Sequence, residues 1–378
     1  MVEDKKRILY YFMEGNAFCS YPFTRARITC EGQISMCCFH RTGNIGNLID
    51  KTFDEIWFGE VAESIRQETY EGRLHDLCKC PGCPFLSSEL KPQAFVYNEY
   101  PTEIEIDLPN THCNVGGFKP TPERPACIMC ERSDPNFVAE VDLLELVLKK
   151  IKHVVPNLVH LHIQGIAEPF WHDQIYRVLN DLGFDEFKDK IQVTTTTNGI
   201  LMKKENRAKW FQVPRSVVVF SIDAATEPTF YKVRGRMDNV FELVVKHLHE
   251  YNAERDRHNQ RLKIHNNINL MNVHEVRGMV QMAKSAGVDV VEFNPTSGFF
   301  TEILVNQYNA QTFRRAHLEI VEEATKIGQK VEFIRPLDLG YVGGTPMQID
   351  WRPNLELNKL VQIDLSNLAG INPRNRAT

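Results

Sequence analysis

The chain has 378 residues, of which 43% are hydrophobic and 25% charged, and its formal net charge at pH 7 is −5. This composition is ordinary for a globular protein, and the acidic balance gives no support to a nucleic-acid-binding surface. The apolar run at residues 8–13 is too short for a secretory h-region. No stretch approaches the ~20 apolar residues of a membrane span. We therefore expect a cytoplasmic protein with neither a membrane nor a nucleic acid as partner.

The cysteines are confined to one part of the chain. All ten lie within the first 130 residues, and the remaining 248 residues contain none. Disulfides are uncommon in a cytosolic chain of this size, so the distribution predicts metal chemistry in the N-terminal third. Seven of these cysteines fall in a turn-rich module that we place at residues 1–95: Cys19, Cys30, Cys37, Cys38, Cys78, Cys80 and Cys83.

Within this module, residues 52–66 are expected to form one helix, with Thr52 as N-cap and Glu55 completing a capping box. Residues 84–102 have the composition of a linker. A second domain is expected over residues 96–300, and residues 301–378 are expected to complete it with a helix, a strand and a tail.

From residue 103 the apolar pattern alternates between strand and helix periods. Strands are expected at 103–108, 159–164, 192–197, 216–223, 263–269 and 289–294, with a further one at 330–337. Helices are expected at 138–152, 173–182, 203–211, 238–253, 273–286 and 308–328. Six strand-then-helix units imply a parallel sheet with right-handed crossovers. The fold class expected is therefore α/β, with a partial (βα)6 barrel.

Three cysteines follow the first of these strands with the spacing C-x13-C-x2-C: Cys113, Cys127 and Cys130. Thiolates favour zinc or the iron of an iron–sulfur cluster, and a site with three protein ligands keeps a position open. In a parallel α/β barrel the C-terminal ends of the strands carry the chemistry. The long loop between Cys113 and Cys127 is expected to cover the metal or meet the substrate.

The ends of the later strands carry motifs that indicate which ligand fills the open position of the metal site. Gln164-GIAEPF ends the second strand, Thr197-Asn198-Gly199 the third, and Ser221-IDAATEPTFYKVRG the fourth. In this order, with the three cysteines and residues 272–295, they resemble the radical S-adenosylmethionine (SAM) enzymes. The usual cysteine spacing of that family is C-x3-C-x2-C, so this chain has ten more residues after the first cysteine. Ala167 stands where the family's G-x-G-E-P motif has its second glycine.

The resemblance implies that the three cysteines hold a 4Fe–4S cluster whose fourth iron binds SAM. It also implies a set of SAM contacts, in which Glu168 and the backbone at Gly165 and Ala167 receive the methionyl amino group. The full implied set is Gly165, Ala167, Glu168, Thr197, Asn198, Ser221, Asp223, Arg234 and Asn294. By contrast, His160 and His162 share one face of their strand, and we interpret them as packed polar side chains. The alternatives are metal ligation and, for His162, a position near the active site.

The N-terminal module resembles the auxiliary iron–sulfur domain called SPASM or, in its shorter form, twitch. Cys19-SYPF, Glu31-GQISMCC, Gly43-NIGNL and Cys80-PGC carry the resemblance. It implies one auxiliary 4Fe–4S cluster held by Cys19, Cys37, Cys80 and Cys83. Cys38 is an alternative to Cys37 and Cys78 to Cys80, and a zinc ribbon is an alternative to the cluster.

A fully ligated auxiliary cluster carries electrons rather than substrate, which favours oxidation. We therefore expect a radical SAM oxidoreductase that dehydrogenates or epimerises a polar small molecule such as a sugar or aminocyclitol. Its electron donor is expected to be a flavodoxin or ferredoxin. The alternative is a maturase that crosslinks or epimerises a short ribosomal peptide.

Overall fold

A computed structural model describes residues 19–37, 43–78, 99–116, 120–121, 126–134, 136–235, 239–296, 303–305, 309–334, 337, 340–342 and 345–347. The chain divides into two compact units. One contains residues 1–109, 140–167 and 173–194, and the other contains residues 110–139, 168–172 and 195–378. The domain boundaries expected from the sequence remain predictions. In the described part of the chain, no helix combines the length and apolarity needed to cross a membrane.

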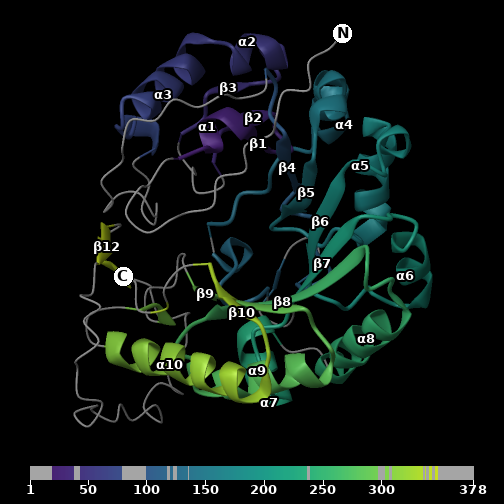
Figure 1. Cartoon of the computed structure of the whole chain (residues 1–378), viewed down its shortest axis with the longest axis vertical. Helices are drawn as coiled ribbons and strands as arrows, with labels where there is room; N and C mark the ends of the chain where they lie inside the picture. The colour runs from purple at the N-terminus through teal and green to yellow at the C-terminus, as the bar shows by residue number, and fades with distance from the viewer. Residues whose placement is uncertain are drawn as a thin grey trace. The chain divides into compact units, whose positions relative to one another are not determined.

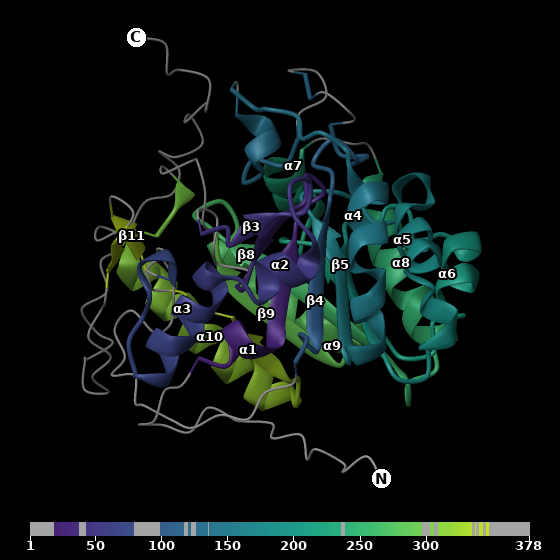
Figure 2. The same cartoon turned by 90° about the horizontal axis from the view of Figure 1, so that it is seen from above.

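The first unit contains a mixed sheet. Its strands are β1 (Arg25–Ile28), β2 (Gln33–Ser35), β3 (Gly46–Asn47), β4 (Glu103–Leu108) and β5 (His160–Gly165). Strand β1 pairs antiparallel with β2 and parallel with β4, and β4 pairs parallel with β5, as Figure 2 shows for β4 and β5. The sheet therefore joins the N-terminal module to the first two strands of the repeating α/β region.

The two faces of this sheet differ in polarity because side chains alternate along a strand. On one face lie side chains that are at most 1% exposed: Ala26, Ile28, Ile104, Ile106, Leu161 and Ile163. The helices α4 (Leu144–Ile151) and α5 (Gln174–Leu182) of this unit contact each other (Figure 1). The opposite face carries charged and polar residues from all three parallel strands.

The described residues of the N-terminal module also form the helices α1 (Tyr21–Thr24), α2 (Phe53–Trp57) and α3 (Glu60–Tyr70). The capping box of Thr52 and Glu55 is confirmed at the start of α2. The expectation of one helix over residues 52–66 is wrong, because the chain is extended at Gly59, with φ −78° and ψ 165°, and a second helix begins there.

A buried arginine connects these helices. Arg66 is 1% exposed, donates hydrogen bonds to the carbonyls of Pro22 (2.9 Å) and Trp57 (2.8 Å), and lies 4.4 Å from the Trp57 ring centroid. Because a buried cation is costly unless it is paired, these contacts fix α1 and α2 against α3.

The second unit continues the alternation of strands and helices. Strand β6 (Gln192–Thr197) begins in the first unit and ends in the second. Strands β7 (Ser216–Ser221), β8 (Gln260–Ile268), β9 (Val290–Pro295) and β10 (Val331–Phe333) follow, and the pairs that join them are parallel. The intervening helices are α6 (Lys204–Trp210), α7 (Glu227–Arg234), α8 (Val240–Glu254), α9 (Val276–Ser285) and α10 (Ala310–Ile327). Helices α9 and α10 lie side by side (Figure 1).

The α/β class is confirmed, with the strand–helix order of a partial (βα)6 barrel behind a small cysteine-rich module. Several details differ from the expectation. The helix expected from residue 138 begins at Leu144, the strand expected at 330–337 is limited to β10, and α7 was not foreseen. A short hairpin, β11 (Gly340–Val342) and β12 (Thr345–Met347), ends the described part of the chain.

Candidate active site

The three cysteines predicted to bind a metal lie in the second unit, and all are partly buried. Cys127 and Cys130 lie in one turn, in which the Cys130 amide donates to the Cys127 carbonyl at 3.0 Å. The Ser133 hydroxyl donates to the same carbonyl at 2.7 Å, and the Ile128 amide donates to the carbonyl of Val233 at 3.0 Å. These bonds hold the C-x2-C turn against the end of α7.

Burial and neighbouring charges shift the pKa values of the three thiols. Burial raises the pKa of Cys113 to about 11 and that of Cys130 to about 12, and the charge of Cys127 raises both further. Burial also raises the pKa of Cys127, while the Arg234 guanidinium opposes this shift. Three partly buried thiols with raised pKa values form a donor set that a thiophilic metal cation or an iron–sulfur cluster would stabilise as thiolates. The residues present therefore fit a cluster with three protein ligands.

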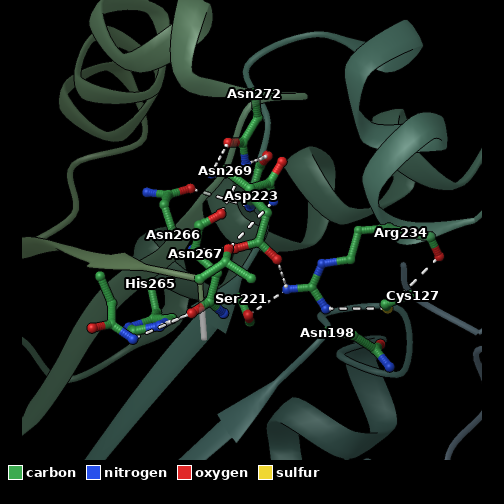
Figure 3. Close-up of polar contacts among 12 residues, drawn as sticks. Cys127, Asn198, Ser221, Asp223, Arg234, His265, Asn266, Asn267, Asn269 and Asn272 are labelled. Atoms are coloured by element: carbon green, nitrogen blue, oxygen red, sulfur yellow. Dashed lines mark hydrogen bonds and ion pairs between the residues drawn. The ribbon is translucent and has the colours of Figure 1, made fainter. Parts of the chain in front are cut away.

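Arg234 connects this donor set to the motif at the end of β7. Its guanidinium lies 3.9 Å from the sulfur of Cys127, forms an ion pair with Asp223 at 2.5 Å, and donates to the Ser221 hydroxyl (Figure 3). The sequence predicted Ser221, Asp223 and Arg234 as SAM contacts. The structure brings all three together at the cysteines, and their role toward SAM remains a prediction.

A group of buried asparagines holds Asp223 in place, and the sequence analysis missed it. Asp223 is fully buried and has a left-handed backbone, with φ +63°. Its amide donates to Asn266 at 3.1 Å, its carboxylate accepts from the amide of Asn267 at 2.6 Å, and its carbonyl accepts from Asn272 at 2.8 Å (Figure 3). The run of asparagines at the end of β8 was the signal that could have revealed this network.

Glu168 forms a second polar centre in the same unit. It is 1% exposed, and its carboxylate accepts hydrogen bonds from the Thr197 hydroxyl (2.7 Å) and the Asn198 amide (2.8 Å). Burial raises the pKa of Glu168 to about 7, although these hydrogen bonds oppose the shift. The backbone amide of Glu168 donates to the carbonyl of His112 (2.7 Å), and the Asn198 side chain donates to that of Asn114 (2.7 Å). Two motifs far apart in sequence are thus tied to both neighbours of Cys113.

Two glycines in these motifs are required by their backbone and surroundings. Gly165 has φ +124°, and a Cβ there would lie 2.9 Å from the Leu108 carbonyl oxygen. Gly199 has φ +79°, and a Cβ there would lie 2.8 Å from the Phe220 ring. Any other residue would be strained at both places, so these motifs depend on glycine for the close approach of neighbouring elements.

The remaining predicted SAM contacts are placed less directly. Gly165 ends β5, and Ala167 follows it in the turn before Glu168. Asn294 lies on β9 and donates to Asn267 at 3.4 Å, next to the network around Asp223. Their contact with SAM remains a prediction.

The predicted auxiliary ligands are only partly described. Cys19 and Cys37 are both partly buried, whereas Cys80 and Cys83, together with the alternative Cys38, lie outside the described residues. Cys78, the alternative to Cys80, lies in a short 3-10 helix, Asp76–Cys78. The ligand set of the auxiliary cluster therefore remains a prediction.

Cys30 differs from these thiols. It is fully buried, and its thiol donates to the Glu140 carboxylate at 3.4 Å. Burial, followed by the charge of Glu140, raises the pKa of Cys30 far above its usual range. Its thiol is held protonated, as expected for a structural cysteine.

Comparison with known families identifies the N-terminal module. Residues 19–84 match the SPASM family. The family is described as an iron–sulfur cluster-binding domain, and the matched segment contains all seven cysteines of the module. The match confirms the expected SPASM-type module and its expected binding of an iron–sulfur cluster. No curated protein sequence matches the chain.

Solved structures are similar to this chain only distantly. SuiB of Streptococcus suis bound to S-adenosylmethionine is 17% identical, with a TM-score of 0.45, over 62% of this chain and 50% of SuiB. Native anSMEcpe with bound AdoMet is 14% identical, with a TM-score of 0.46, over 62% of this chain and 64% of anSMEcpe. TYW1 with a lysine-pyruvate adduct bound is 17% identical, with a TM-score of 0.35, over 53% of this chain and 67% of TYW1. The match to the first of these spans about half the length of SuiB.

Proposed function

We propose that this chain is a radical SAM enzyme whose SPASM module assists the oxidation or epimerisation of a polar small molecule. The observation that carries the proposal is the link between the motifs. Glu168 and Asn198 are tied to the neighbours of Cys113, and Arg234 contacts Cys127, all within one compact unit. Separate strand ends therefore converge on one cysteine donor set, as catalysis at a barrel rim requires.

In this proposal Cys113, Cys127 and Cys130 hold a 4Fe–4S cluster and leave one iron for SAM. When bound, the cluster and SAM supply a 5′-deoxyadenosyl radical that removes hydrogen from a C–H bond. Glu168 accepts a hydrogen bond from the SAM amino group, and Thr197 and the Asn198 amide hold its carboxylate in position. This support is the kind of fixed polar environment that reactive sites need.

In the proposed site Arg234 has two roles. It compensates the negative charge of the Cys127 thiolate, and it offers a cation for the carboxylate of SAM. Asp223 neutralises part of its charge and fixes its direction, and the buried asparagines hold Asp223. We propose that Ser221, which accepts a hydrogen bond from Arg234, contacts the ribose of SAM.

A polar substrate is supported by the side chains on neighbouring strands of the second unit. On β8 and β9, Lys263 forms an ion pair with Glu292 at 2.6 Å, and His265 lies 3.4 Å from the same carboxylate. Asn267 and Asn294 continue this face toward the strand ends. Hydroxyl and amino groups of a sugar or aminocyclitol would find donors and acceptors here, whereas an apolar substrate would leave them unpaired.

The SPASM module supports the choice of oxidation. In our proposal Cys19, Cys37, Cys80 and Cys83 close an auxiliary 4Fe–4S cluster that takes an electron from the substrate radical. A flavodoxin or ferredoxin is the electron donor for SAM cleavage. The alternative product class is a crosslinked or epimerised ribosomal peptide. Epimerisation removes no net electron from the substrate. It would need a hydrogen-atom donor to the substrate radical in place of an electron-accepting cluster.

Two measurements test the proposal. Iron analysis of the anaerobically reconstituted chain should give about eight irons, from two four-iron clusters, and about four irons with one zinc would instead support a zinc ribbon. Candidate sugars, aminocyclitols and peptides carrying deuterium at single carbons are then incubated with SAM. Deuterium in 5′-deoxyadenosine from a carbinol carbon supports the proposal, and deuterium only from a peptide would move the chain to the alternative class.

A further inference from the structure

Three potential metal ligands meet at the start of two neighbouring strands, in the unit that does not contain Cys113, Cys127 and Cys130. Glu103 is the first residue of β4 and pairs in register with His160, the first residue of β5. His162 lies two residues further along β5, on the same face. One ligand atom from each of Glu103, His160 and His162 lies within 4.8 Å of the other two, and all three residues are partly buried. The Nε2 atom of His162 is 3.2 Å from the Glu103 carboxylate.

The charges around this group leave a negative excess. Two arginines on β1 face three carboxylates on β4. Arg25 forms ion pairs with Glu103 (3.2 Å) and Glu105, and Arg27 with Asp107 (2.5 Å) and Glu105 (3.5 Å). Since arginine stays protonated in proteins, two positive charges against three negative ones leave a net charge of −1 on this face when all the carboxylates are ionised.

The Glu103 carboxylate and the two imidazoles thus lie in a partly buried place beside further carboxylates, where a bound metal ion would be stabilised.

We propose that Glu103, His160 and His162 bind a divalent transition-metal ion of the zinc type. Two imidazoles and one carboxylate are a donor set that such ions prefer. Zinc bonds of about 2.1 Å place the ligand atoms of a tetrahedral site about 3.4 Å apart. Small rotations of the two rings, whose centroids lie 6.2 Å apart, would bring atoms now within 4.8 Å to that spacing. This interpretation replaces that of two packed polar histidines.

Arg25 fits the site as a supporting residue. It already contacts the Glu103 carboxylate, and ligating carboxylates are commonly oriented by such hydrogen bonds. Because the protein supplies three ligands, a fourth position stays open for water or for an oxygen of a bound molecule. The site does not depend on the radical SAM proposal, since none of its residues contributes to the cysteine donor set.

The test measures zinc bound by the anaerobically reconstituted full chain after equilibrium dialysis against Zn²⁺. The chain as it stands is compared with His162→Gln and with a matched control, His153→Gln. His153 also pairs with a carboxylate, that of Asp54 at 2.9 Å, but lies outside the proposed site. Zinc bound by cysteines that hold no iron adds the same amount to the measured zinc content of all three proteins. Iron content and circular dichroism are recorded for each, so that loss of a cluster or of the fold is seen separately.

We expect the chain and His153→Gln to bind one more zinc per chain than His162→Gln, with equal iron in all three. Zinc should also raise the melting temperature of the first two and not of His162→Gln, because a ligand stabilises the folded state that binds it. Arg25→Lys should bind the extra zinc ten- to a hundredfold more weakly, as outer-shell changes do. Equal zinc in the chain and His162→Gln, with no difference in melting temperature, would overturn the site.

Discussion

The raised pKa of Glu168 makes a quantitative prediction about stability and pH. The pKa is about 7 in the folded chain, against an ordinary value of 4.5. Between these values the folded state holds a proton that the unfolded state has lost, so stability falls as pH rises through the window. One pKa unit corresponds to about 1.4 kcal/mol. Integrated from pH 5 to pH 8, ionisation of Glu168 should lower the free energy of unfolding by about 2.5 kcal/mol.

Glu168→Gln removes the ionisable group and keeps the shape of the side chain. Its altered hydrogen bonds to Thr197 and Asn198 shift stability by an amount that does not depend on pH. Relative to the unmodified chain, the variant should therefore gain about 2 to 3 kcal/mol between pH 5 and pH 8. The measurement is anaerobic urea unfolding of both proteins at several pH values, without SAM.

A control separates this effect from general changes with pH. Asp289 is partly buried, which opposes ionisation, but its ion pair with Arg255 lowers the pKa below the ordinary value of 3.8. Its stabilising effect is present above the unfolded pKa and is lost only as pH falls through the folded one. The difference between Asp289→Asn and the unmodified chain should thus stay constant from pH 5 to pH 8. A constant difference for Glu168→Gln as well would refute the assignment of a raised pKa to this carboxyl.

Three further predictions concern single residues. Gly199→Ala should lower the free energy of unfolding by more than about 2 kcal/mol, because the strain of a left-handed backbone adds to the overlap of the new Cβ with Phe220. The control is Gly328→Ala: Gly328 has φ +65°, but a Cβ there would meet no atom closer than 3.9 Å, so the cost should be only about 1 kcal/mol. Equal costs of the two substitutions in thermal unfolding would contradict the role of the Phe220 contact. Asp223→Asn should lower the affinity for SAM at least tenfold in equilibrium dialysis, because it removes the charge that directs Arg234; unchanged affinity would exclude that role. Cys83→Ala should still cleave SAM under strong reductant but should not turn over substrate, and full turnover would exclude the auxiliary cluster as electron carrier.

The sequence predicted those parts of the molecule in which local pattern and covalent order determine the structure. Strand β4 was predicted with its observed bounds because apolar and polar residues alternate in Glu103–Leu108, although the structure buries side chains on both faces of the strand. The capping box at Thr52 was also predicted, because both of its hydrogen bonds lie within four residues. By contrast, the sequence did not predict the end of α2, because the helical pattern of residues 52–66 does not indicate the extended backbone at Gly59.

The sequence could not reveal contacts that depend on tertiary packing. Nothing in the chain order indicates that Arg234 lies against the sulfur of Cys127, 107 residues away. The sequence also did not indicate that the charged residues of β1 lie beside those of β4, because the parallel pairing of these two strands was not expected. His160 and His162 were recognised as sharing a face. The pairing of β4 with β5 places Glu103 beside them, and that of β1 with β4 places Arg25 beside Glu103.

The central claim is that Cys113, Cys127 and Cys130 hold a cluster that cleaves SAM. The most direct test reduces the anaerobically reconstituted chain with dithionite in the presence of SAM and measures 5′-deoxyadenosine and methionine by liquid chromatography and mass spectrometry. We expect both products in equal amounts from the unmodified chain and from Cys30→Ala, and neither from Cys113→Ala. Absence of 5′-deoxyadenosine from a chain that contains its full complement of iron, or its equal formation by Cys113→Ala, would contradict the claim.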